Sequence, residues 1–228
     1  MFEGALAPGM LSVICRLTED PSLTRGFRLA GGTALALHFG HRRSVDLDFF
    51  STEPFVEENV VGGLLAAGGT IVAREERTVH ALVESVKCSF FGYPYRWISS
   101  GIPFHGIELA GVPDIAAMKV VAIAQRGTKK DFFDLYEILR GISIQEETWC
   151  QHRICQYPKC ARMARLRRVL LEKYGDRRVN CYHVVRSLAF FEEAEGEPDP
   201  VSLNGTTWEE VKSFFLSRER SHFSDLVC

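Results

Sequence analysis

The sequence has no long hydrophobic run and no excess of charge of either sign. No stretch approaches the roughly 18 to 20 uninterrupted apolar residues that a membrane-spanning helix needs. The start, Met1-Phe2-Glu3-Gly4, lacks the basic residues and the apolar run of a signal peptide. Of the 228 residues, 46% are hydrophobic and 25% are charged. This composition predicts a globular, cytoplasmic protein of one large or two small domains, without a membrane partner.

Cysteine does not indicate a disulfide framework. The seven cysteines are an odd number in a chain long enough to form a hydrophobic core, so reduced thiols are expected. One group, Cys150, Cys155 and Cys160, has His152 within it. Tetrahedral zinc sites usually pair ligands about two to four residues apart. The spacing therefore favours free thiols over a zinc site.

The net charge of −2 argues against general binding to nucleic acid. The charge is nevertheless uneven, because residues 151–180 contain nine basic and two acidic residues, a net +7. Within this segment Arg162, Arg165 and Arg168 share one stripe of a predicted helix. They predict a surface that contacts the phosphates of a nucleic acid. A solvated helix surface explains the same residues.

The hydrophobic pattern changes along the chain from strands to helices. It predicts strands at 45–50, 70–74, 79–84 and 86–91, and helices at 11–18, 31–40 and 55–67. From Pro113 it predicts only helices, at 114–125, 131–139, 161–173, 181–195 and 207–219. A sheet followed by helices indicates the α+β class, with an α/β core over 1–112 and a helical part over 113–228.

Asp46 and Asp48 are the clearest local signal of chemistry. Residues i and i+2 of a strand point to the same side, so these two carboxylates share one face while Val45, Leu47 and Phe49 take the core face. Carboxylates about 7 Å apart repel each other unless a cation lies between them. Mg²⁺ prefers a few carboxylates together with substrate phosphates. The pattern predicts a metal site, although a solvated edge strand would also account for it.

A glycine-rich helix start precedes the acidic strand. Glycines allow backbone N–H groups to approach an anion, and a helix N-terminus adds positive potential. The neighbouring side chains could hold phosphate oxygens, although a tight packing turn is equally rich in glycine. We therefore predict a nucleotide-binding segment formed by Gly31, Gly32, Thr33, Arg42, Arg43 and Ser44.

These motifs resemble those of the AbiEii/AbiGii abortive-infection toxins, nucleotidyltransferases of the DNA polymerase β-like superfamily. The resemblance is carried by Gly31-Gly32-Thr33, by Gly40-His41-Arg42-Arg43-Ser44 and by Asp46-Leu47-Asp48, followed by Asp114 to Lys119 and Arg126 to Tyr136. It implies a polymerase β-like core with a small mixed sheet, an NTP substrate and Mg²⁺ or Mn²⁺. It also implies transfer of a nucleoside monophosphate to a hydroxyl of RNA, for some relatives tRNA, or of protein. A toxin–antitoxin setting with a cognate antitoxin partner follows from the same resemblance.

The resemblance further implies a helical lysine and a later aspartate in the catalytic cleft, here Lys119 and Asp131 or Asp134. Lys119 lies on a mostly apolar helix face, where a lysine is costly without a partner. It could contact triphosphate oxygens or extend to the surface. The two aspartates could instead pair with nearby basic residues.

One position departs from the family pattern. Polymerase β-like transferases commonly carry a third carboxylate on a later strand, and the matching position here is Ser89. Either Asp131 or Asp134 supplies that charge, or turnover is weak, or the chain is an inactive nucleotide-binding or protein-binding module.

Overall fold

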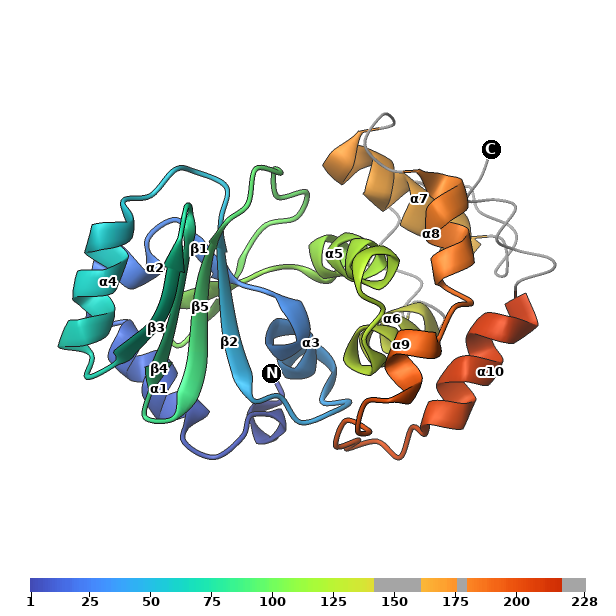
Figure 1. Cartoon of the computed structure of the whole chain (residues 1–228), viewed down its shortest axis with the longest axis horizontal. Coiled ribbons are helices and arrows are strands. Elements are labelled where there is room, and N and C mark those ends of the chain that lie inside the picture. Colours follow the sequence, from blue (N-terminus) through green and yellow to red (C-terminus); the bar gives the residue numbers. More distant parts are fainter. Residues whose placement is uncertain (142–160, 176–179, 219–228) are drawn as a thin grey trace. The chain divides into compact units, whose positions relative to one another are not determined.

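The computed structural model describes residues 1–141, 161–175 and 180–218. The chain divides into two compact units, Met1–Gly111 and Val112–Cys228 (Figure 1). The sheet lies in the first unit and the described part of the second is helical, so the α+β class is confirmed. None of the helices in the described ranges is both long enough and apolar enough to span a membrane.

The first unit is built on a mixed seven-stranded sheet with the order β3-β4-β5-β2-β1-β7-β6. β2 lies at its centre, parallel to β5 and antiparallel to β1. The strands are β1 (Phe27–Leu29), β2 (Asp46–Ser51), β3 (Thr70–Glu75), β4 (Thr78–Val83), β5 (Val86–Gly92), β6 (Ile102–Phe104) and β7 (Ile107–Leu109).

One face of this sheet forms the core of the first unit. The alternation of β2 buries Leu47 and Phe49, which join Cys88 and Phe90 of β5 in the same apolar cluster. The rings of Phe49 and Phe90 stack with centroids 4.8 Å apart. The helices of this unit are η1 (Glu3–Ala5), α1 (Met10–Leu17), α2 (Pro21–Thr24), α3 (Gly31–Phe39) and α4 (Glu57–Ala66).

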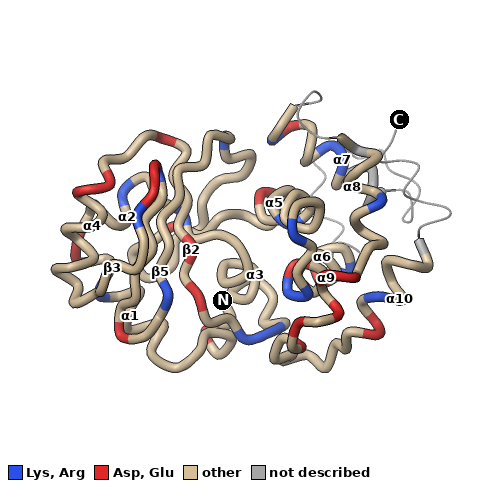
Figure 2. The backbone as a smooth tube through the Cα atoms, viewed as in Figure 1, with Lys and Arg blue, Asp and Glu red and all other residues tan. Residues whose placement is uncertain are grey.

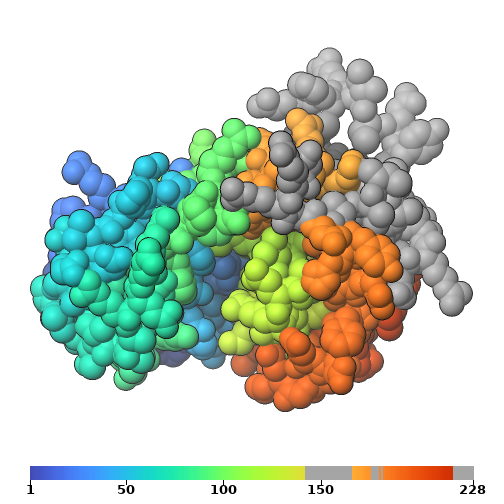
Figure 3. Space-filling view, turned by 45° about the horizontal axis from the view of Figure 1, so that its top comes forward, coloured from blue at the N-terminus to red at the C-terminus, as the bar shows by residue number. Residues whose placement is uncertain are grey.

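Helices α1, α2 and α4 contribute the apolar residues that cover this face. At the surface, α4 lies beside β3 (cyan and teal in Figure 3). The odd-numbered residues of β2 are therefore committed to packing, and Asp46 and Asp48 face the other side of the sheet.

The strands predicted from alternation are confirmed to within two residues at each end. Among the elements that the structure describes, five short ones, η1, α2, β1, β6 and β7, were not predicted, because three or four residues are too few for a periodic pattern. The prediction that Val45 anchors the strand in the core is wrong. Val45 precedes β2 and is 50% exposed.

The second unit begins with α5 (Val112–Gln125) and α6 (Lys129–Gly141), which pack against each other. The Lys173 ammonium lies 2.6 Å from an Asp114 carboxylate oxygen, and both side chains are fully buried. This ion pair connects α5 to α7. The remaining helices are α7 (Ala161–Tyr174), α8 (Cys181–Ser187), α9 (Glu192–Glu195) and α10 (Trp208–Arg218).

The single helix predicted over 181–195 is wrong, because α8 ends at Ser187 and α9 begins at Glu192. Phe191 lies in the break, and its ring contacts those of Phe132 and Trp208 at centroid distances of 4.9 and 5.6 Å. Packing of this aromatic residue therefore overrides the helical pattern at that point.

Candidate functional site

The two aspartates of β2 lie where the strand begins. Asp46 and Asp48 are both half-buried and lie on either side of the fully buried Leu47. Figure 2 shows the acidic positions of β2 within the first unit. Since their Cβ atoms point to the same face, the strand presents two carboxylates with little freedom to move apart.

The start of α3 lies directly against one of these carboxylates. The Ala30 N–H donates to the carbonyl of Asp48 at 2.9 Å. Gly31 has a φ of +63°, in the left-handed region that favours glycine, and a Cβ added there would be 3.6 Å from Asp48 Oδ2. The glycine thus allows the helix N-terminus to lie close to Asp48.

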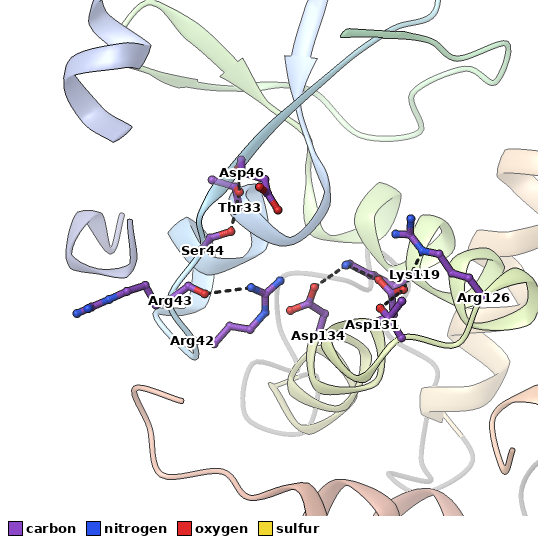
Figure 4. A network of polar contacts seen from close by, with 10 residues as sticks. Thr33, Arg42, Arg43, Ser44, Asp46, Lys119, Arg126, Asp131 and Asp134 are labelled. Atoms are coloured by element: carbon purple, nitrogen blue, oxygen red, sulfur yellow. Dashed lines mark hydrogen bonds and ion pairs between the residues drawn. The ribbon is translucent and has the colours of Figure 1, made fainter. Parts of the chain in front are cut away.

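Thr33 holds this helix to the strand. Its hydroxyl lies 2.7 Å from Ser44 Oγ and donates to the carbonyl of Asp46 (Figure 4). Thr33 and Ser44 are buried, and the N-cap of α3 is Ala30, which makes no side-chain cap. The two hydroxyls therefore connect the segments that position Asp46.

The two arginines differ in exposure. Arg43 is exposed, whereas Arg42 is buried and its guanidinium donates to the Arg43 carbonyl at 3.1 Å. Both follow Gly40, which ends α3 in a left-handed conformation with φ +64°.

In the second unit, Lys119, Asp131 and Asp134 form a buried ion network. The Lys119 Nζ lies 2.8 Å from Asp131 Oδ1 and 2.6 Å from Asp134 Oδ2, and Asp131 also pairs with Arg126 at 3.2 Å (Figure 4). Lys119 is 6% exposed, so it does not extend to the surface. The network explains how α5 tolerates a lysine on its apolar face.

Two opposing effects set the pKa of Asp131. Burial raises it, but the charge of Lys119, together with Arg126 and a hydrogen bond from Thr128, outweighs burial and lowers the pKa below its usual value. Asp131 is therefore held as a carboxylate.

Comparison with known proteins now identifies the family. Residues 13–98 match the model of the nucleotidyl transferase AbiEii toxin, type IV toxin–antitoxin system. Over 210 residues the chain is 33% identical to the uncharacterized protein aq_aa25 of Aquifex aeolicus, covering 87% of this chain and 89% of that protein. The chain belongs to the AbiEii nucleotidyltransferase family. The matched segment contains Gly31, Asp46 and Asp48, the elements of the site in the first unit.

Solved structures agree with the fold of this AbiEii family member. JHP933 from Helicobacter pylori aligns with a TM-score of 0.51 at 16% identity, covering 97% of this chain and 94% of that one. A structure from H. pylori described as a candidate nucleotidyltransferase also gives 0.51 at 15% identity, covering 95% and 92%. At these identities the likeness concerns the fold.

The residues of this AbiEii nucleotidyltransferase fit a magnesium ion whose remaining ligands come from the substrate. Within the described ranges, no group of three or more His, Cys, Asp or Glu side chains could hold a metal ion. Asp46 and Asp48 supply two hard oxygen donors, and Mg²⁺ typically takes one or two carboxylates and fills its other positions with phosphates and water. Gly31 brings the N-terminus of α3 close to Asp48, and a helix N-terminus suits the phosphate oxygens that would complete such a site.

Two predicted features lie wholly or partly outside the described residues. Cys150, Cys155 and Cys160 fall in the undescribed range 142–160. Of the three arginines predicted to contact phosphates, Arg168 in α7 is exposed, whereas the side chains of Arg162 and Arg165 are outside the described part.

His80 of β4 was not predicted from the sequence. Its Nδ1 lies 3.0 Å from Ser89 Oγ, and Ser89 is the register partner of Asp48. Alternation in two separate strands could have placed each side chain on this face, but only the strand pairing brings them together.

Proposed function

We propose that the chain moves a nucleoside monophosphate from an NTP to an acceptor hydroxyl, with Mg²⁺ or Mn²⁺ held by Asp46 and Asp48. The observation that carries this proposal is that β2 presents Asp46 and Asp48 on one face, close to the start of α3 at Gly31. The chain in which this occurs is a member of the AbiEii family. In the reaction, the acceptor oxygen forms a bond to the α-phosphorus, the bond from that phosphorus to pyrophosphate breaks, and the hydroxyl proton is released.

The residues of the first unit have separate roles in this proposal. The backbone N–H groups at Gly31 and Gly32 face the phosphates at the positive end of α3. Thr33 and Ser44 position the strand that bears Asp46, and Arg42 and Arg43 add positive charge before it. When bound, the metal ion neutralises negative charge at the reacting phosphate.

We propose a role for three further residues, a cation and two carboxylates of the second unit. We propose that Lys119 stabilises charge at the triphosphate and that Asp131 and Asp134 set its position. The support is the lysine held by both carboxylates within a buried network, because a restrained ammonium loses little freedom when it meets an anion.

The acceptor in this proposal is RNA, and the setting is a toxin–antitoxin or abortive-infection system with an antitoxin as partner. The family description supports the setting. The exposed Arg168 on α7, with Arg162 and Arg165 on the same helix, supports contact with phosphates. Such contacts carry no base specificity, so the shape of the RNA end would select the acceptor.

The test is incubation of the purified chain with total RNA or total protein and each labelled NTP, with Mg²⁺ or with EDTA. We expect label in one class of RNA with one preferred NTP, and none with EDTA. Label on protein alone would contradict the RNA acceptor. Nucleotide binding without transfer to either acceptor would contradict the enzyme and favour a binding module.

A further inference from the structure

A row of three polar side chains crosses the face of the sheet that bears Asp46 and Asp48. Asp48 of β2 is the register partner of Ser89 in the parallel strand β5, and Ser89 is the register partner of His80 in the antiparallel strand β4. Register partners point to the same face of a sheet. Ser89, the position that departs from the family pattern, therefore lies between Asp48 and His80.

The contacts within this row are specific. Ser89 is 1% exposed, and its hydroxyl lies 3.0 Å from His80 Nδ1. The Phe91 ring meets the His80 ring edge-on at a centroid distance of 5.5 Å, which restrains the imidazole. A serine this deeply buried has little access to a substrate. A role in orienting Asp48 therefore suits it better than the role of a catalytic base.

A hydroxyl between a histidine and a carboxylate can connect them. If His80 Nδ1–H donates to Ser89 Oγ, the serine retains its own O–H for donation. The strand register places the side chain of Asp48 beside Ser89 on the same face of the sheet, and an O–H donated to its carboxylate would orient that group. Carboxylates that bind metals are commonly oriented by such hydrogen bonds, and loss of one typically costs about 10- to 100-fold in metal affinity or activity.

We propose that His80 and Ser89 are positioning residues that orient Asp48 for the metal ion. The inference rests on the proposed function, since it assigns support to the metal-binding carboxylate. It gives Ser89 a role other than that of a missing third carboxylate, and it requires His80 to carry a proton on Nδ1.

The experiment measures Mn²⁺ binding by the full chain, from the electron paramagnetic resonance signal of free Mn²⁺, without nucleotide. We expect Ser89→Ala and His80→Phe each to raise the Mn²⁺ Kd about 10- to 100-fold. The double variant should bind no more weakly than Ser89→Ala, because the two residues act in series. His80→Asn should retain most of the affinity, since its amide can still donate to the serine.

A matched control is Thr78→Val, two residues from His80 on the same face of β4 and opposite Phe91. It should leave the Mn²⁺ Kd unchanged. Wild-type affinity in both Ser89→Ala and His80→Phe, with binding lost in Asp48→Asn, would overturn this inference and leave the proposed function intact. Binding that is unaffected by Asp48→Asn would instead overturn the metal site itself. Ser89→Ala keeps the test decisive if His80→Phe fails to fold.

Discussion

Replacement of Gly31 by alanine separates the stability of the α3 turn from its role at the site. With φ at +63°, an alanine costs about 1–2 kcal/mol of folding free energy, because its Cβ approaches the following carbonyl. For a chain of this size that loss lowers the Tm by roughly 2–8 °C. The new methyl group would also lie 3.6 Å from Asp48 Oδ2, in the space assigned to phosphate and metal. Displacement of reacting groups by about 1 Å can cost about 100-fold in rate.

Gly9 offers a matched control for this substitution. It too has a positive φ, +85°, but a Cβ there meets nothing within 4 Å. We expect Gly31→Ala and Gly9→Ala to lose similar stability in thermal denaturation, while only Gly31→Ala loses about 100-fold in nucleotide transfer. Transfer by Gly31→Ala at the Gly9→Ala rate would refute the assignment of this turn to the phosphates.

Two further predictions follow from buried groups. Burial, together with the negative charges of Asp48 and Asp46, raises the pKa of Cys88 to about 12. At pH 8 iodoacetamide should therefore label the exposed Cys15 and spare Cys88, as measured by peptide mapping. Equal labelling of the two cysteines would contradict the burial of Cys88. Lys119→Met should destabilise the chain by about 3–5 kcal/mol in urea denaturation, because it leaves two buried carboxylates without their shared cation. A loss below about 1 kcal/mol would show that the network contributes little.

Much of the first unit was predictable from the sequence, because its strands alternate and α3 begins and ends at glycines. Asp46 and Asp48 could be placed on one face from their spacing alone. The elements that alternation missed are three or four residues long, and they include β1, the antiparallel neighbour of β2. Their strands form through pairing with distant segments, which local periodicity does not report.

The side-chain contacts were less predictable. Nothing in the local pattern indicates that the Thr33 hydroxyl bonds to Ser44 and to the Asp46 backbone, or that His80 lies beside Ser89. The pairing of Asp131 and Asp134 with basic residues was anticipated, but Lys119 as their shared partner required the packing of α5 against α6.

The two β2 carboxylates are central to the proposed transfer. The deciding measurement is the rate of labelled nucleotide transfer by wild type, Asp46→Asn and Asp48→Asn, with Glu53→Gln as the control from an exposed position just after β2. We predict that each aspartate variant loses at least about 100-fold in rate while the Tm changes little and Glu53→Gln transfers normally. Wild-type rates in Asp46→Asn and Asp48→Asn would contradict the proposed site.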